Sequence, residues 1–529
     1  MGLCIVVSFS LVQLATLIGL GAMVTRVARV KASWVAMGWC GFAVFLVAAE
    51  LAHVFFPLGH WFGPAMAVLG AFGWKYAFER RPRHAALLLL PVVALSFAAL
   101  APVFARDNGL YFIQSTLWLR DFAAVPGLGN LHPCLGANHA YFAWVAAWAV
   151  GPVHEQPWLV ANVALLTLAC APGILAVAKW RKPNVSEAVG IVLLGPLFDV
   201  ALSGQLSSPV ADIGLACVQT ALTLWFIEAC TREVERNEAM LAAFVAVAFA
   251  TLKLAGAYQA VVVWGFMVFA LRRQPRAVVI TMLVSVSLII PWLVNGLIST
   301  GYPLYPTPAF GLPVTWRVPE EVARAYLNVS SAQHHALVLY DRSGVLRGDW
   351  PLFWLERTWV DNRTFLIPAV LWLTGLVASL LRRDRALLRF SLGMGAALAL
   401  WFVVSPELRF AQLTLWGAGA GTLAMLLRTR TLLFGVVSAA IIGWAFVEAP
   451  LPRLTFALPA APAWNSRTFT LKSGDELKLG DGNFDCYELP CALCPYESLR
   501  LREPGNLAAG FQRDPADTEF FECGGLSAP

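Results

Sequence analysis

The stretch "MGLCIVVSFSLVQLATLIGLGAMVTRVARVK" (residues 1–31) decides the class of the protein, because a long uncharged run ends in a basic cluster. A helix of about 20 apolar residues crosses the hydrocarbon core of a bilayer, which is about 30 Å thick. No basic residue precedes the apolar run, so the stretch predicts a first membrane span rather than a cleaved signal peptide. The Arg and Lys residues after the run are typical of a cytoplasmic loop, which places the N-terminus on the outer side.

The composition of the whole chain extends this prediction. Of 529 residues, 59% are hydrophobic and only 13% are charged, with 21 Trp and 33 Phe. A soluble protein could not bury so much apolar surface in one core, whereas repeated uncharged runs match a bilayer. We therefore expect an all-α polytopic membrane protein surrounded by lipid. Its net charge of +6 is explained by Lys and Arg in cytoplasmic loops, so no nucleic-acid partner is expected.

Basic clusters divide the chain into spans and set their direction. The clusters expected to face the cytoplasm are residues 26–31, 79–84, 179–182, 231–236, 271–276, 381–385 and 428–430. About fourteen spans are predicted between them: residues 3–25, 33–56, 61–78, 85–104, 157–179, 188–205, 210–229, 240–254, 256–270, 277–298, 364–382, 386–404, 408–427 and 431–449. This count places both termini on the outer side of the membrane. The run 240–270 has room for only two short helices, with Gly256 as the natural break.

The spans define three regions of the chain. Residues 1–84 hold the N-terminal transmembrane helices, and residues 85–449 form the main transmembrane module. Two long outer loops, 105–156 and 299–363, belong to this module. Residues 450–529 form a tail that is predicted to lie outside the cytoplasm.

Four of the ten cysteines gather in the tail, at Cys486, Cys491, Cys494 and Cys523. An even number of cysteines in an exported segment predicts disulfides, in agreement with an oxidising compartment. Cys491 and Cys494 also form a Cys-x-x-Cys pair, which is half of a zinc or redox motif. No second pair of this kind accompanies it in the sequence, so disulfides of undetermined pairing are favoured, and no metal or other cofactor is expected.

Polar residues gather in the first outer loop, directly after a span. Asp107 opens "NGLYFIQSTLWLRDF", in which Leu110, Ile113, Leu117 and Phe122 recur at the spacing of a helix lying on the membrane surface. A partly desolvated carboxylate at this place could act as a general base or orient a metal. The alternative is that Asp107 only caps this helix.

The rest of the first outer loop is rich in turn-forming residues. Its stretch "PGLGNLHPCLGANH" (126–139) lets the backbone pass close to a ligand, to which His132 and His139 could donate hydrogen bonds. The alternative is that both histidines are merely solvated. The following segment, 138–152, is too short to span comfortably and is predicted to be an interfacial or re-entrant helix.

Charged residues inside or near spans are further candidates, because burying them is costly. Lys253 in "FATLKLAGAY" either snorkels to the interface or holds a phosphate as a compact charge in a mid-span break. Asp212 follows the turn "SGQLSSPV" and could be only a helix cap. Glu407 and Arg409 in "WFVVSPELRF" lie at the outer end of a span, where an arginine runs against the positive-inside bias. They are either interface residues or contacts for an anion.

Two tyrosines lie in a proline-rich stretch at the start of the second outer loop. "STGYPLYPTPAFG" (299–311) places Tyr302 and Tyr305 between prolines that stiffen the backbone. Such a stretch suits the wall or lid of a ligand site, or is a plain connector.

Several of these strings occur together, in this order, in a family of uncharacterised bacterial membrane proteins. They are "RDNGLYFIQSTLWL", "VPGLGNLH", "SGQLSSPVAD", "TLKLAG", "PWLVNGLISTGYPLYP" and "WFVVSPELRF", followed by the Cys-rich tail. The resemblance covers most of residues 85–515. This family in turn resembles the GT-C glycosyltransferase superfamily, through the position of one acidic residue and through its general architecture.

The resemblance to GT-C enzymes implies a fold, a reaction and a site. It implies a GT-C-like helical bundle that transfers a sugar from a polyprenyl-phosphate-linked donor to a saccharide or glycolipid acceptor at the outer face, in envelope polysaccharide or glycolipid assembly. Asp107 would be the catalytic acid or base, and Lys253 and Arg409 would hold the donor phosphate. Substrate contacts would come from Asn108, Tyr111, His132, Asn138, His139, Asp212, Tyr302, Tyr305 and Glu407.

Three positions depart from the pattern of the resembled family. Phe112 stands where a histidine is expected, an expected arginine near Asn295 is missing, and Pro-Glu-Leu-Arg (406–409) replaces Pro-Asp-Pro-Arg. The third position keeps its acid and its arginine, whereas the missing histidine and arginine leave open an altered donor specificity or an inactive chain. Two other functions therefore remain: a transporter or flippase of a lipid-linked saccharide, which would not need Asp107, and a membrane scaffold whose disulfide-bonded tail binds a partner.

Overall fold

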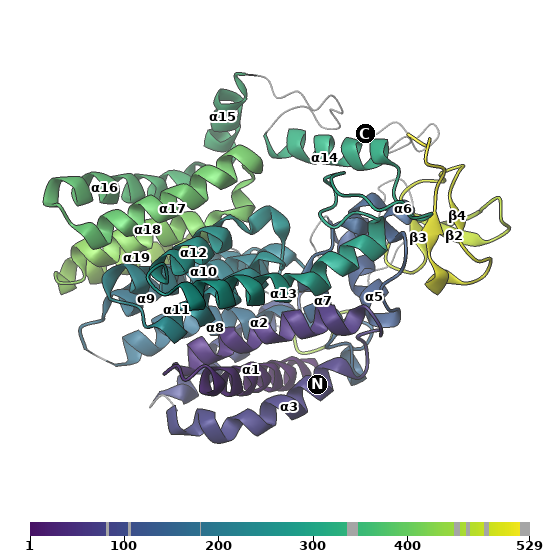
Figure 1. Cartoon of the computed structure of the whole chain (residues 1–529). Helices are drawn as coiled ribbons and strands as arrows, with labels where there is room; N and C mark the ends of the chain where they lie inside the picture. The colour runs from purple at the N-terminus through teal and green to yellow at the C-terminus, as the bar shows by residue number, and fades with distance from the viewer. Residues whose placement is uncertain are drawn as a thin grey trace.

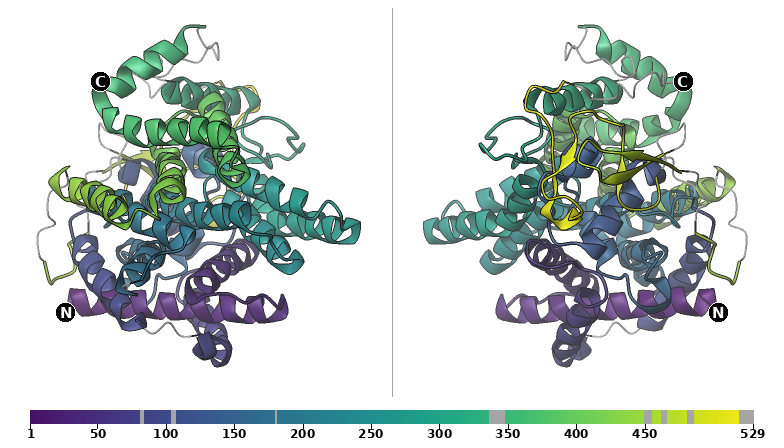
Figure 2. Two further views of the ribbon diagram at one scale, coloured as in Figure 1. Left: turned by 90° about the vertical axis from the view of Figure 1, so that its left-hand side faces the viewer. Right: turned by 90° about the vertical axis from the view of Figure 1, so that its right-hand side faces the viewer.

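Long apolar helices form the body of the structure, a computed structural model that describes residues 1–80, 84–103, 107–179, 181–335, 348–448, 455–461, 466–480 and 486–518. The long helices pack side by side in one bundle, and short strands lie at one end of it (Figure 1). We call this the tail end of the bundle, because the described residues of the tail (455–461, 466–480 and 486–518) pack there. The opposite end, where the loops carry the basic clusters, is the basic end; the two views of Figure 2 face these two ends.

Helices occupy all of the segments predicted to be spans. They are α1 (Gly2–Val27), α2 (Trp34–His53), α3 (Phe62–Ala77), α4 (Leu89–Ala99), α8 (Trp158–Ala178), α9 (Val185–Leu202), α10 (Ala211–Thr231), α11 (Arg236–Ala250), α12 (Tyr258–Ala270), α13 (Pro275–Thr300), α16 (Leu366–Arg382), α17 (Arg385–Val404), α18 (Gln412–Leu427) and α19 (Thr431–Glu448). In the described residues, seven of these are long and apolar enough to cross a membrane: α1, α2, α8, α9, α10, α13 and α17. The prediction of a mainly helical membrane protein is confirmed at this level.

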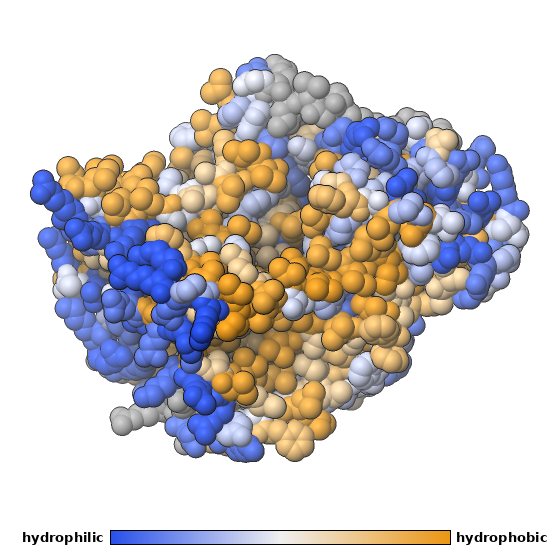
Figure 3. All heavy atoms as spheres, in the orientation of Figure 1, coloured by the Kyte–Doolittle hydropathy of each residue, from blue (hydrophilic) through white to orange (hydrophobic). Residues whose placement is uncertain are grey.

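The surface has the polarity that a bilayer requires. Apolar residues cover the middle of the face in Figure 3, and hydrophilic residues gather at its two ends, over the loops of the basic end and over the strands. Large apolar side chains such as Phe72, Leu283 and Leu381 are exposed on the helices. Lipid tails can cover such side chains, whereas water would penalise a continuous apolar band.

Glycines bring the first three helices into backbone contact. A Cβ atom on Gly41 of α2 would lie 1.8 Å from the carbonyl oxygen of Leu17 in α1. A Cβ atom on Gly19 of α1 would lie 1.9 Å from the carbonyl oxygen of Gly70 in α3. Small residues at helix crossings permit this approach, which is a common means of packing helices in lipid.

Most of the first outer loop is buried, contrary to the prediction of a surface helix. It contains the π-helical turn η3 (Asn108–Phe112), α5 (Ile113–Asp121), α6 (Leu128–Leu131), η4 (Pro133–Gly136) and α7 (Ala140–Ala146). Most of α5 is buried, because the tail covers Trp118 and α7 packs against the other side of α5. All residues of α7 are buried too, so protein encloses this helix, and the re-entrant form predicted for residues 138–152 stays a prediction. A short helix that is apolar all round is stable only when other protein elements enclose it.

The second outer loop and the tail complete the tail end. The loop contains α14 (Glu320–His334) and α15 (Trp350–Asn362). In the tail, β1 (Ser466–Thr470) pairs antiparallel with β2 (Glu476–Gly480), which pairs parallel with β3 (Cys491–Ala492). A second, antiparallel sheet joins β4 (Arg500–Leu501) to β5 (Phe511–Gln512).

The predicted disulfides are present in the described part of the tail. Cys486 and Cys491 form a disulfide that closes the segment before β3. Cys494 is disulfide-bonded as well, and Cys523 lies outside the described residues. The prediction of a disulfide-containing tail is therefore confirmed.

The tail shares a hydrophobic core with the first outer loop. Trp118 and Leu131 of the loop pack with Tyr496 and Phe511 of the tail. Backbone hydrogen bonds fix the contact: Cys486 N donates to Gly109 O at 2.7 Å, and Phe511 N donates to Pro126 O at 2.9 Å. The turn that begins at Asp107 is thus held in place by the disulfide-bonded segment of the tail.

Candidate functional site

Four charged side chains from distant segments meet at the tail end of the bundle. We call Asp107, Asp212, Lys253 and Arg409 the charge cluster. Arg409 lies in η8 (Leu408–Phe410), and its Nη1 atom is 3.3 Å from Asp107 Oδ2 and 3.7 Å from Asp212 Oδ2. Lys253 Nζ forms an ion pair with Asp212 Oδ1. Arg409 therefore bridges both carboxylates, and Asp212 contacts both cations.

Neither aspartate acts through a side-chain helix cap. Asp107 occupies the N-cap position of η3 but makes no capping hydrogen bond. Asp212 lies in the first turn of α10, one residue after the first helical position, and the N-cap Val210 provides no side-chain cap. The capping alternatives are wrong for both residues, because their carboxylates face the two cations instead.

Lys253 lies inside the protein, in the break between α11 and α12. Its side chain is 4% exposed, and the backbone around it is extended before the short helix η6 (Leu254–Gly256). The snorkelling alternative is wrong, because Asp212 neutralises the ammonium within the bundle. Gly256 lies at the end of the break, as predicted. A Cβ atom added to it would lie 2.3 Å from the side chain of Leu215 in α10, so a glycine lets the break pack against α10.

A buried polar network holds the turn that carries Arg409. Gln219 Nε2 of α10 donates to Phe410 O at 2.6 Å, and Gln219 Oε1 accepts from Thr414 N at 3.3 Å. Gln259 of α12 accepts from Thr414 Oγ1 at 2.9 Å and donates to Thr223 Oγ1 at 2.8 Å. Neither glutamine was predicted from the sequence, although polar amides within apolar spans were a usable signal.

The ring of Phe410 lies against both cations of the charge cluster. It is 4.3 Å from Lys253 Nζ and 5.2 Å from Arg409 Cζ, measured to the ring centroid. An aromatic face attracts cations through its quadrupole and excludes water on that side. Phe410 therefore orients both cations, and this role was also missed in the sequence.

The cluster is graded from exposed to buried. The side chains of Arg409 and Asp107 are 48% and 28% exposed, whereas those of Asp212 and Lys253 are 11% and 4% exposed. Arg409 and Asp107 can thus meet a ligand, and the other two residues lie beneath them. An anion could bind Arg409 only in competition with the carboxylate of Asp107.

Two histidines lie next to the cluster. Burial, together with the positive charge of Lys253, lowers the pKa of His139 to about 3. Burial and the charges of Arg409 and Lys253 lower the pKa of His334 in α14 to about 3 as well. His334 Nδ1 is 2.8 Å from Ser405 Oγ, and its ring meets the edge of Phe410 at 5.1 Å. Both rings are therefore neutral near pH 7. No sequence pattern singled out His334.

Three predicted substrate-binding residues border the cluster. Asn108 is buried, and its Nδ2 donates to Ser208 Oγ at 2.9 Å. Burial raises the pKa of Tyr111 well above its ordinary value, and the charge of Asp107 raises it further, so the phenol stays protonated. Burial also raises the pKa of Glu407, while Arg409 opposes this effect.

Four other predicted residues make internal contacts of the outer loops. His132 Nδ1 accepts from Cys134 N at 3.1 Å, and Asn138 Nδ2 donates to Trp292 O at 2.7 Å. Tyr302 donates to Val318 O at 3.0 Å, and Tyr305 stacks on Tyr326 with 5.7 Å between ring centroids. His132 is only 1% exposed, so the solvated alternative is wrong for it.

Fold and site together define a helical membrane protein with a partly open charge cluster at one end of its bundle. Residues 3–416 match the family model described as a domain of unknown function, DUF8201, and the chain belongs to this family. The match includes all four residues of the charge cluster and excludes the tail. No curated protein and no solved structure matches the chain.

Proposed function

We propose that the protein is a GT-C-like glycosyltransferase that transfers a sugar from a polyprenyl-phosphate donor at the outer face of a bacterial inner membrane. The acceptor is a saccharide or glycolipid of the cell envelope. The observation that carries the proposal is the meeting of Asp107, Asp212, Lys253 and Arg409 at one end of the helices. The reaction needs a base for the acceptor hydroxyl and cations for the departing phosphate, and the cluster supplies both.

The resting ion pair suggests an order of events. Arg409 is the exposed cation and takes the donor phosphate, because a guanidinium binds phosphate oxygens in two-point contacts. The phosphate then displaces Asp107 from Arg409, and the freed carboxylate accepts the proton of the acceptor hydroxyl. Lys253 adds a fixed positive charge behind Arg409, and Asp212 positions both cations.

The proposal includes a membrane arrangement with fourteen spans. These are α1–α4, α8–α13 and α16–α19, with the basic end in the cytoplasm and the tail end in the periplasm. α11 and α12 have 15 and 13 residues, or about 22 and 20 Å, less than a bilayer core of about 30 Å. This short pair would bring Lys253 to the depth where a lipid phosphate meets Arg409.

The change Asp107→Asn tests the proposal. It should lower sugar transfer by at least about a hundredfold, since a positioned base contributes about 10²- to 10⁴-fold. Transfer is measured with purified protein, a panel of polyprenyl-phosphate-linked hexoses and an envelope lipid extract as the acceptor. The same variant should bind the polyprenyl phosphate itself about two- to fivefold more tightly, because a partly exposed ion pair of about 0.2–1 kcal/mol no longer competes.

Asp121→Asn is the matched control, because Asp121 lies in the same outer loop and pairs with Arg120. It should leave transfer and phosphate binding unchanged. Full transfer by the Asp107→Asn variant would refute the proposal that Asp107 is the catalytic base of a glycosyltransferase. If that variant instead keeps translocating a lipid-linked saccharide and Arg409→Gln stops it, the protein is a transporter or flippase.

A further inference from the structure

A cavity of about 360 Å³ opens at the basic end of the bundle, far from the charge cluster. Its lining comes from α2, α8, α9, α10, α11 and α12 and the loops between them. α10 joins the two places: Asp212 at one end and Glu228 at the cavity are sixteen residues apart, or about 24 Å along the helix. The volume falls in the range of about 300–1,000 Å³ that is typical of small-molecule sites.

The inner wall of the cavity is apolar. Trp39 and Cys40 of α2 line it together with Leu175 of α8, Leu224 of α10 and Met267 of α12. Such a wall suits hydrocarbon. The charged residues lie around the mouth and the apolar residues lie inside. This order matches the polar head and the acyl chains of a lipid in a bilayer leaflet.

One side of the mouth carries excess positive charge. Lys179 Nζ and Arg181 Nη2 bind the same carboxylate oxygen of Glu187, at 2.5 and 2.8 Å. This group of two cations and one anion has a net charge of +1. Lys31, exposed on the loop before α2, adds a second positive charge, and Ser33 adds a hydroxyl.

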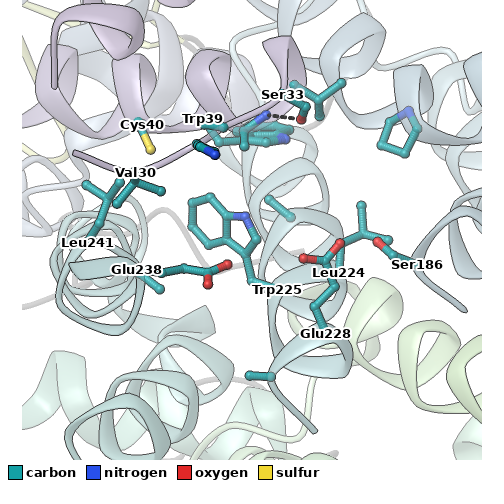
Figure 4. Close-up of a pocket in the computed structure, with 18 of the residues that line it drawn as sticks. Val30, Ser33, Trp39, Cys40, Ser186, Leu224, Trp225, Glu228, Glu238 and Leu241 are labelled. Atoms are coloured by element: carbon teal, nitrogen blue, oxygen red, sulfur yellow. Dashed lines mark hydrogen bonds between the residues drawn. The ribbon is translucent and has the colours of Figure 1, made fainter. Parts of the chain in front are cut away.

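A second group of charges at the mouth, where α10 leads into α11, carries excess negative charge. Arg232 pairs with Glu228 of α10 at 3.3 Å and with Glu238 of α11. One cation between two carboxylates leaves a net charge of −1. Figure 4 shows the carboxylates of Glu228 and Glu238 on either side of the indole of Trp225. Carboxylates beside an aromatic face are the chemistry that recognises an ammonium group.

We propose that this cavity binds the head of a zwitterionic phospholipid. The phosphate lies at Lys31 and Lys179, and the first part of the acyl chains lies along the apolar wall. The ammonium lies at the carboxylate of Glu228 beside Trp225, because Arg232 already holds both carboxylate oxygens of Glu238. A positive group and a separate negative group at the mouth favour a head that carries both charges. An anionic lipid would place no positive group at the two glutamates. The proposal does not depend on the glycosyltransferase proposal, because it uses none of the residues of the charge cluster.

Native mass spectrometry of the purified full-length protein tests this site. The protein is equilibrated with equal amounts of phosphatidylethanolamine, phosphatidylcholine and phosphatidylglycerol, and the retained lipid is identified after release. Zwitterionic lipid should be retained at least about fivefold over phosphatidylglycerol. Equal retention of all three lipids, or a preference for phosphatidylglycerol, would overturn the proposal.

Substitutions at the mouth test whether the retained lipid lies in the cavity. Glu238→Gln and Lys31→Gln should each reduce the retained zwitterionic lipid severalfold, because each removes one charge from one side of the mouth. Glu233→Gln and Lys182→Gln are matched controls on the neighbouring loops, outside the lining, and should have no effect. If Glu238→Gln does not fold, Lys31→Gln decides, since Lys31 is exposed. Retention in Lys31→Gln equal to that in Lys182→Gln would overturn the proposal.

Discussion

Asp107 shows how much a single residue depends on partners that lie far away in the chain. Its position at the start of a helical turn is that of a cap, and the sequence around it supports this interpretation. In the structure its carboxylate lies 3.3 Å from a guanidinium 302 residues further along. The burial of Lys253 beside Asp212 also depends on a distant partner. The sequence around each of these two residues does not indicate the other one.

His132 gives a pH-dependent prediction at the residue scale. Burial lowers its pKa to about 3, whereas an unfolded histidine titrates near about 6.5. Between these values the unfolded chain binds one proton more than the folded chain, so the free energy of unfolding falls as the pH falls. The loss is about 1.4 kcal/mol for each pH unit below 6.5, or about 2 kcal/mol at pH 5.

The change His132→Asn keeps an acceptor for Cys134 N and removes the titration. Thermal unfolding in detergent should therefore drop less between pH 7 and pH 5 in the variant than in the unchanged protein. An equal drop in both proteins would show that His132 carries no part of the acid sensitivity.

At the scale of elements, helix positions were predictable and their packing was not. Every predicted span overlaps a helix, because apolar length and flanking charge are local properties of the chain. The burial of α5 and α7 was not predictable, since it depends on the tail, which comes more than 300 residues later. The apolar residues of α5 do recur at helical spacing, but they face protein rather than lipid.

The crossing of α1 and α2 gives a prediction at this scale. The change Gly41→Ala should lower the free energy of unfolding by about 1–3 kcal/mol, because the new methyl group meets the backbone oxygen of Leu17 and forces the helices apart. The effect is measured as a lower thermal midpoint. Gly435→Ala in α19 is the control: its Cβ atom enters open space, so stability should stay level or rise slightly. Equal midpoints for the two variants would contradict close packing at Gly41.

At the scale of the whole molecule, the tail and the first outer loop form one unit. Phe511 lies in the same core as Trp118. A backbone hydrogen bond joins the tail to Gly109, next to the charge cluster. Removing residues 450–529 would therefore uncover the core behind Asp107. Such a deletion would disturb an enzyme as much as a scaffold, and it cannot separate the two functions.

The orientation of the bundle is a prediction for the whole molecule. Ser473→Cys places a thiol in the turn between β1 and β2, and Arg273→Cys places one in the loop between α12 and α13. A membrane-impermeant maleimide should label the first variant in intact spheroplasts. It should label the second only after permeabilisation, because the basic end is predicted to face the cytoplasm. The reverse pattern would invert the proposed arrangement.

By itself the sequence determined the membrane class, the helical segments, the break near Gly256 and the disulfide-bonded tail. These features follow from apolar run length, local charge and cysteine content, which are all read within a few tens of residues. Only the tertiary structure decided that Asp107, Asp212, Lys253 and Arg409 form one cluster, that the first outer loop is buried, and that an amphipathic cavity lies at the basic end. Ion pairs and cavities depend on distances in space, and packing sets those distances between segments that are remote along the chain.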